Sequence, residues 1–127
     1  MKIVLTKSES EKIFFDCLCN ICSYWNGYGL VIDYDASAYK LAREKITPEN
    51  RTFESVVMQI LKDGGKLMVI DEENNGEYNR EISLKDIHRL VSKTPVDNLL
   101  NIQTGNDDVN DADAVLQTVF FGEIIFG

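Results

Sequence analysis

The residues best suited to chemistry in this sequence are three cysteines and one histidine. Cys17, Cys19 and Cys22 follow the spacing Cys-x-Cys-x-x-Cys, and the only other soft metal ligand is His88. On a helix Cys17 and Cys19 point roughly 200° apart, and no second cysteine pair exists to complete a tetrahedral site. An apolar helix also raises thiol pKa values, which disfavours a Cys–His nucleophilic pair. We therefore predict no metal and no cofactor, and expect free, buried cysteines in a reducing compartment.

Two aspartates around Tyr34 form a second candidate. Asp33 and Asp35 are predicted to lie at the end of a strand with both carboxylates on one face, where such a pair can share a proton or hold a hard cation. Asp35 equally suits the cap of the following helix. The sequence contains no Walker loop, Gly-x-Gly-x-x-Gly, Gly-x-Ser-x-Gly or His-Glu-x-x-His motif. We predict a non-enzymatic protein; the alternative is a small enzyme or ligand-binding domain whose pocket, between the N-terminal helix and the sheet, uses Asp33, Asp35 or His88.

The acidic residues are unevenly distributed along the chain. The net charge is -8; residues 1–64 hold eight bases and nine acids, whereas residues 65–127 hold five bases and twelve acids. No Lys or Arg follows Lys93. Because affinity for nucleic-acid phosphates comes largely from Lys and Arg, we predict no direct nucleic-acid binding. A protein partner with a basic surface is expected instead, and the alternative is that the acidity serves solubility alone.

Two acidic segments make up the predicted binding surface, namely the tip of a hairpin and residues 97–113. The aspartates of the second segment lack the spacing and the twelfth-position Glu of a calcium loop. The predicted partner-binding residues are Glu72, Glu73, Glu77, Asp97, Asp107, Asp108, Asp111 and Asp113.

One helix is expected to organise the fold. Ser8 to about Trp25 is apolar at most positions, and such a helix belongs in the interior. Ser8 and Glu11 have capping-box spacing at its start, and Asn26-Gly27 marks its end.

The remaining elements follow from local signals. Apolar runs predict strands over Lys2–Thr6 and Leu30–Tyr34, and Asn75-Gly76 suits a type I′ turn between strands Leu67–Asp71 and Tyr78–Ile82. Helical periodicity and capping residues predict five further helices, over Ala36–Lys45, Phe53–Lys62, Leu84–Lys93, a segment after Thr94-Pro95, and Asp108–Phe120. The apolar tail, residues 121–127, is expected to dock.

Together these elements predict an α+β fold in which a small antiparallel sheet with a β-hairpin packs around a buried N-terminal helix, with about six helices in all. A length of 127 residues suits one domain, 1–127. No apolar run reaches the length of a membrane span, and the N-terminus does not resemble a signal peptide. We expect a cytoplasmic protein that does not bind membranes.

The C-terminal stretch carries a resemblance. Asp111-Ala112-Asp113-Ala114-Val115-Leu116-Gln117, followed by Phe120 to Gly127, is similar to the ending of small acidic proteins of unassigned function from bacterial phages and mobile elements, over about 17 residues. That class includes inhibitors of host defence nucleases, such as anti-restriction and anti-CRISPR proteins. The resemblance implies an inhibitor of a host nucleic-acid-processing enzyme.

Our leading hypothesis is therefore an acidic protein-binding module. A third hypothesis is a structural homo-oligomer in which exposed aromatic side chains around Trp25 or Phe126 form a symmetric contact. The sequence alone does not fix the oligomeric state.

Overall fold

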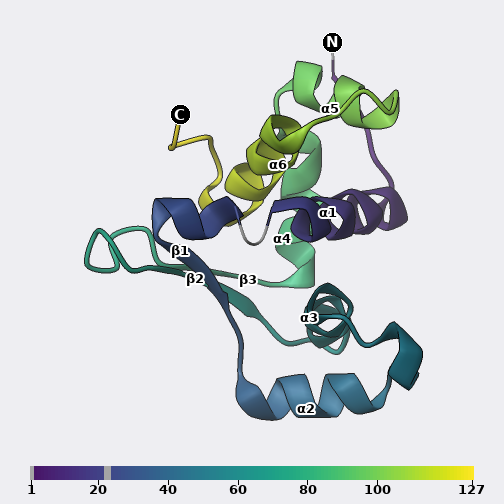
Figure 1. The fold of residues 1–127 in the computed structure, drawn as a ribbon. Coiled ribbons are helices and arrows are strands. Elements are labelled where there is room, and N and C mark those ends of the chain that lie inside the picture. Colours follow the sequence, from purple (N-terminus) through teal and green to yellow (C-terminus); the bar gives the residue numbers. More distant parts are fainter. Residues whose placement is uncertain (1, 22–23) are drawn as a thin grey trace.

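The computed structural model describes residues 2–21 and 24–127. Within them lie six α-helices and a three-stranded antiparallel sheet, which confirms the predicted α+β class (Figure 1). The helices are α1 (Lys7–Ile21), α2 (Ala36–Glu44), α3 (Phe53–Lys62), α4 (Leu84–Leu90), α5 (Val96–Gln103) and α6 (Val109–Phe121). The strands are β1 (Leu30–Asp33), β2 (Leu67–Asp71) and β3 (Arg80–Ile82), and short 3-10 helices are η1 (Tyr24–Tyr28), η2 (Pro48–Asn50) and η3 (Val91–Lys93). None of the described helices is long and apolar enough to span a membrane.

The start of α1 differs from the prediction. The Glu9 backbone N–H donates to Thr6 Oγ1 (3.1 Å) and the Thr6 N–H donates to Glu9 Oε1 (2.9 Å), so Thr6 and Glu9 form the reciprocal cap. The predicted capping box at Ser8 and Glu11 is wrong because this overlapping pattern lies two residues earlier. The carboxylate of Glu11 is consequently left for a long-range contact.

The predicted strand over Lys2–Thr6 is also wrong. In the described residues before α1 the chain is irregular and pairs with no strand. Figure 1 shows this segment beside α5, on the far side of α1 from the sheet. Its apolar residues Ile3 and Leu5 are partly buried against the core, while Val4 is 84% exposed. Hydrophobicity alone could not show that no strand edge lies within reach.

The hydrophobic core lies mainly between α1 and α6. α1 buries one face, whereas nine of the 13 residues of α6 are buried. α6 packs against α1, α4, α5 and β3, so it is the most enclosed helix of the described chain. Trp25, in η1 rather than in the predicted N-terminal helix, is fully buried against Phe120 and Phe121.

The sheet has the order β1-β2-β3, with β2 in the centre. Leu30 pairs with Asp71 across β1 and β2, and Leu67 pairs with Ile82 across the predicted hairpin. The hairpin is confirmed, although β3 begins at Arg80 rather than Tyr78. Asn75 and Gly76 have φ of 53° and 79°, as a type I′ turn requires.

The C-terminal tail docks on α6, as predicted from its apolar residues. The Gln117 side chain is fully buried, and its Oε1 accepts hydrogen bonds from the backbone N–H groups of Ile125 (2.8 Å) and Phe126 (2.9 Å). Phe126 then stacks on Tyr28 with ring centroids 5.6 Å apart. One buried amide therefore fixes the path of the tail.

Candidate functional site

The hairpin tip is organised by a buried carboxylate that the sequence analysis did not single out. Asp71, at the end of β2, is only 2% exposed. Its Oδ1 accepts from the backbone N–H groups of Glu73 (3.2 Å) and Asn74 (3.0 Å), and its Oδ2 accepts from that of Tyr78 (3.2 Å). Burial acts to raise the pKa of Asp71, but the bonds from Asn74, Tyr78 and Glu73 outweigh it and lower the pKa. The signal was an aspartate directly before a turn, which commonly bonds the backbone ahead of it.

Three predicted binding residues lie on this fixed tip. The side chains of Glu72, Glu73 and Glu77 are exposed to solvent. We call them the hairpin acidic patch. Because Asp71 holds the backbone beneath them, the tip presents three carboxylates on an ordered loop.

The junction of α5 and α6 contains the remaining predicted residues, and Asp111 does not lie on its surface. Asp111 is 4% exposed, and its Oδ1 accepts from the side-chain amides of Asn98 (2.8 Å) and Asn101 (3.1 Å) on α5. Its Oδ2 accepts from the Asp108 backbone N–H (3.0 Å), and Asp108 in turn caps α6. Burial acts to raise the pKa of Asp111, but these hydrogen bonds outweigh it and lower the pKa. Asp111 therefore ties α5 to α6, and its expected exposure is wrong.

Asp113 is likewise engaged inside the fold. The indole Nε1–H of Trp25 donates to Asp113 Oδ1 (2.7 Å), and the amide of Gln117 donates to Oδ2 (2.9 Å). Asp113 thus satisfies two buried side chains. A partner would have to break these bonds to use both of its oxygens.

Asp97, Asp107 and Asp108 remain exposed at this junction. We call these three residues the α5–α6 acidic patch. In the described part of the chain, the ion pairs all involve other residues. The negative charge of both acidic patches is therefore uncompensated by a directly bonded Lys or Arg.

The two acidic patches do not form one surface. In Figure 1 the hairpin tip projects at the far left, whereas α5 and the loop into α6 lie at the upper right. They were predicted to form one surface because both lie in the acidic part of the sequence after residue 64. The structure separates them at opposite ends of α6.

The cysteines have different environments. Cys17 is buried, and burial, followed by the charges of Asp16, Asp107 and Asp111, raises its pKa to about 12. Cys19 is exposed, and its pKa is raised by partial burial and by Glu54 and Asp16. Cys22 lies outside the described residues.

The part of the chain that the structure describes contains no arrangement of side chains suited to a metal. Among the described residues, no three His, Cys, Asp or Glu side chains come together in a way that would hold a metal ion.

The two aspartates of the pocket hypothesis are not brought into a shared site. Asp35 caps α2, and its Oδ2 accepts from the Ala38 backbone N–H (2.9 Å). Asp33 is exposed at the end of β1. Neither lines the groove between α1 and α3 described below.

His88 is a packing residue with a specific partner. Its Nε2 lies 2.8 Å from Glu11 Oε2, and this contact joins α4 to α1. The two side chains are 18% and 24% exposed. The sequence analysis missed Glu11 because it assigned that carboxylate to a local cap.

The homo-oligomer hypothesis named exposed aromatic side chains around Trp25 or Phe126. Trp25 is fully buried, so it does not itself belong to an exposed aromatic surface. Phe126 is partly buried and contacts Tyr28, Tyr78 and Phe121. Tyr24 is 44% exposed and remains accessible.

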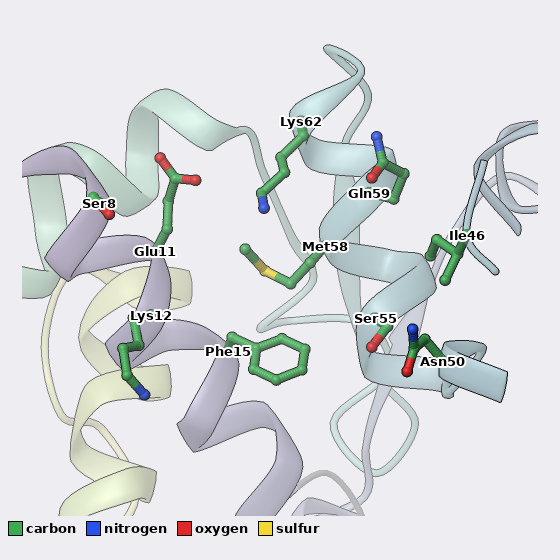
Figure 2. A pocket seen from close by; sticks show the side chains of 10 residues that line it. All are labelled: Ser8, Glu11, Lys12, Phe15, Ile46, Asn50, Ser55, Met58, Gln59 and Lys62. Carbon is green, nitrogen blue, oxygen red and sulfur yellow. The ribbon is translucent and has the colours of Figure 1, made fainter.

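A groove of about 440 Å³ lies between α1 and α3, with η2 at one end (Figure 2). Its volume is within the usual range for small-molecule sites. Apolar side chains line its floor, and hydroxyl, amide and charged groups surround them. The lining residues are Ser8, Glu11, Lys12, Phe15, Ile46, Asn50, Ser55, Met58, Gln59 and Lys62.

No protein-family model matches the chain, and neither a curated protein nor a solved structure is significantly similar to it.

Proposed function

We propose that this protein is a non-enzymatic module that binds a basic surface on a protein partner, chiefly through the α5–α6 acidic patch. The observation that carries the proposal is the uncompensated charge of this patch. Its three carboxylates are exposed, and no Lys or Arg follows Lys93 in the sequence. Opposite charge across an interface accelerates association and favours the correct partner.

The electrostatic environment of Cys17 supports this choice of patch. Burial is the main cause of the raised pKa of Cys17, and the charges of Asp16 from α1, Asp107 from the α5–α6 loop and Asp111 from α6 add to it. Carboxylates from three elements therefore act on one region of the molecule. Asp16 is paired with Lys12 and Asp111 is hydrogen-bonded inside the fold, so a cationic partner surface would chiefly compensate Asp107.

The ordered backbone at the patch is a second support. Asp108 and Asp111 form a reciprocal cap at the start of α6, and two α5 asparagines bond Asp111. The exposed carboxylates are thus carried on a fixed junction, which reduces the entropy lost on binding. The hairpin acidic patch is a separate candidate surface at the other end of α6.

The partner that we propose is a nucleic-acid-processing enzyme of a bacterial host. The support is the C-terminal resemblance to small acidic proteins of phages and mobile elements, together with the exposed carboxylates. Enzymes that act on nucleic acid carry basic surfaces for phosphate groups. An acidic module that covers such a surface would inhibit the enzyme, without binding nucleic acid itself.

Two charge-matched variants test the proposal. The first replaces Asp97, Asp107 and Asp108 with Asn, which remains a good helix cap at position 108. The second replaces Glu72, Glu73 and Glu77 with Gln, and so changes the net charge equally at the other patch. Each tagged protein is used in a pull-down from bacterial host lysate at low and high salt, with bound proteins identified by mass spectrometry.

We expect the first variant to lose a partner that the wild type and the second variant retain, and we expect high salt to release that partner. Loss of the partner with the second variant alone would assign partner binding to the hairpin acidic patch instead. Equal retention by both variants, or tight binding of DNA or RNA by the purified protein, would overturn the proposal.

A further inference from the structure

Two opposite charges face the same end of the α1–α3 groove. Glu11 extends from α1 and Lys62 extends from α3, and Figure 2 shows both reaching toward the space above Met58. They are not bonded to each other: in the described residues, Lys62 takes part in no ion pair, and Glu11 is paired with His88. The groove therefore offers a carboxylate and a free ammonium at one place.

The carboxylate of Glu11 is held in position by its hydrogen bond with His88. An ionised Glu11 accepts hydrogen bonds only, so the Nε2 of His88, 2.8 Å away, must carry the proton that it donates. This bond occupies Oε2. The other oxygen, Oε1, is left for a donor that enters the groove.

The floor beside these charges is apolar. Met58 is 4% exposed and Phe15 is half-buried, and in Figure 2 their side chains lie below Glu11 and Lys62. Lys12 also lines the groove, but its Nζ is paired with Asp16 Oδ2 at 2.8 Å. Its charge is thus compensated within α1.

We propose that this groove binds a small zwitterion with an apolar body, of the size and form of an apolar or aromatic α-amino acid. The ligand's ammonium binds Glu11, its carboxylate binds Lys62, and its side chain lies on Met58 and Phe15. The site is independent of the acidic patches.

The charges of the groove favour a zwitterion over a singly charged ligand. A simple anion that binds Lys62 meets the negative charge of Glu11, and a simple cation that binds Glu11 meets the positive charge of Lys62. Only a ligand with both charges forms a favourable ion pair with each of these two residues. The apolar floor selects against small zwitterions such as glycine, because they leave the exposed part of Phe15 in contact with water.

The first test uses the unmodified protein and four probes. L-phenylalanine is titrated against the isotope-labelled protein, and amide NMR shifts are followed; phenethylamine, 3-phenylpropionate and glycine each lack one of the three recognised features. We expect saturable shifts confined to α1 and α3 with L-phenylalanine, and affinities at least about fivefold weaker for the other three probes. No saturable shift with L-phenylalanine up to its solubility limit, or equal affinity for the singly charged analogues, would overturn the proposal.

The second test uses variants with one charge removed. Glu11→Gln keeps an acceptor for His88, and Lys62→Met keeps the length of the side chain. Each should weaken L-phenylalanine binding about fivefold, whereas Lys40→Met, on the exposed surface of α2 outside the groove, should leave it unchanged. An unchanged affinity in both groove variants would overturn the assignment of these two residues. The probe series on the wild type does not depend on whether any variant folds.

Discussion

Two buried threonines, Thr94 and Thr118, differ in the hydrogen bonding of their hydroxyl groups. The hydroxyl of Thr118 donates to the Ala114 carbonyl oxygen at 2.7 Å. The hydroxyl of Thr94 is equally buried, 2% exposed as a residue, yet it has no hydrogen-bond partner among the described residues. An unpaired buried hydroxyl loses its hydration without compensation.

We predict that Thr94→Val stabilises the protein by about 1 kcal/mol, because valine fills the same space without a polar group to bury. Thr118→Val is the matched control, and should destabilise by about 1 kcal/mol. Urea unfolding followed by circular dichroism measures both. Destabilisation by both substitutions would show that Thr94 has a partner in solution.

The cysteines provide a second prediction at this scale. Cys17 is buried with a pKa of about 12, whereas Cys19 is exposed. Because the thiolate is the reactive form, iodoacetamide at mildly alkaline pH should modify Cys19 in the native protein and leave Cys17 intact until urea is added. Fragment-ion mass spectrometry distinguishes the two positions. Equal modification rates in the native protein would contradict the burial of Cys17.

Between elements, Asp111 makes a polar connection from α6 to α5 through Asn98 and Asn101. We predict that Asp111→Ala destabilises the protein by about 2 kcal/mol, since it removes a capping carboxylate and leaves two asparagine amides without their acceptor. Asp107→Ala, four residues earlier and exposed, should change the unfolding free energy by less than about 0.5 kcal/mol. Thermal and urea unfolding measure both effects. Destabilisation of similar size by the two substitutions would argue against the connection.

The elements with purely local signals were predictable from the sequence. Asn75-Gly76 identified the hairpin, a capping signal identified the start of α4, where Ser83 and Asp86 form the cap, and the apolar tail indicated docking. Each of these signals lies within a few residues of the structure that it specifies. The element bounds differ by a few residues, because helix and strand ends depend on contacts as well as on propensity.

The candidate sites were less predictable because they depend on contacts between distant residues. The sequence predicts Asp111 and Asp113 as surface residues. In the fold Asn98 donates a hydrogen bond to Asp111, and Trp25 donates one to Asp113. Glu11 looked like a cap, yet its partner is 77 residues away. The groove between α1 and α3 has no sequence signature, since it arises from the packing of two helices.

The whole molecule should lose stability in acid. The pKa values of Asp71 and Asp111 are lowered in the folded state, so the unfolded chain binds protons more readily. Their contribution is fully present above the ordinary aspartate pKa of about 3.9 and is lost as the pH falls through the lower folded values.

We therefore predict that the unfolding free energy decreases steadily as the pH falls below about 5. Asp111→Asn should show a smaller decrease than the wild type, whereas Asp107→Asn should parallel the wild type. Urea unfolding at a series of pH values gives the slopes. Identical slopes for the wild type and Asp111→Asn would contradict the lowered pKa of Asp111.

The placement of α6 has a consequence for how the protein is made. This helix follows the other described helices in the sequence, yet it covers the apolar face of α1, where Phe14 packs against Phe120. During synthesis, that face has no native cover until residues 109–121 have left the ribosome. The nascent chain therefore exposes this face of α1 until α6 has emerged, and we expect the domain to fold only after that point, with chaperones as its earliest contacts.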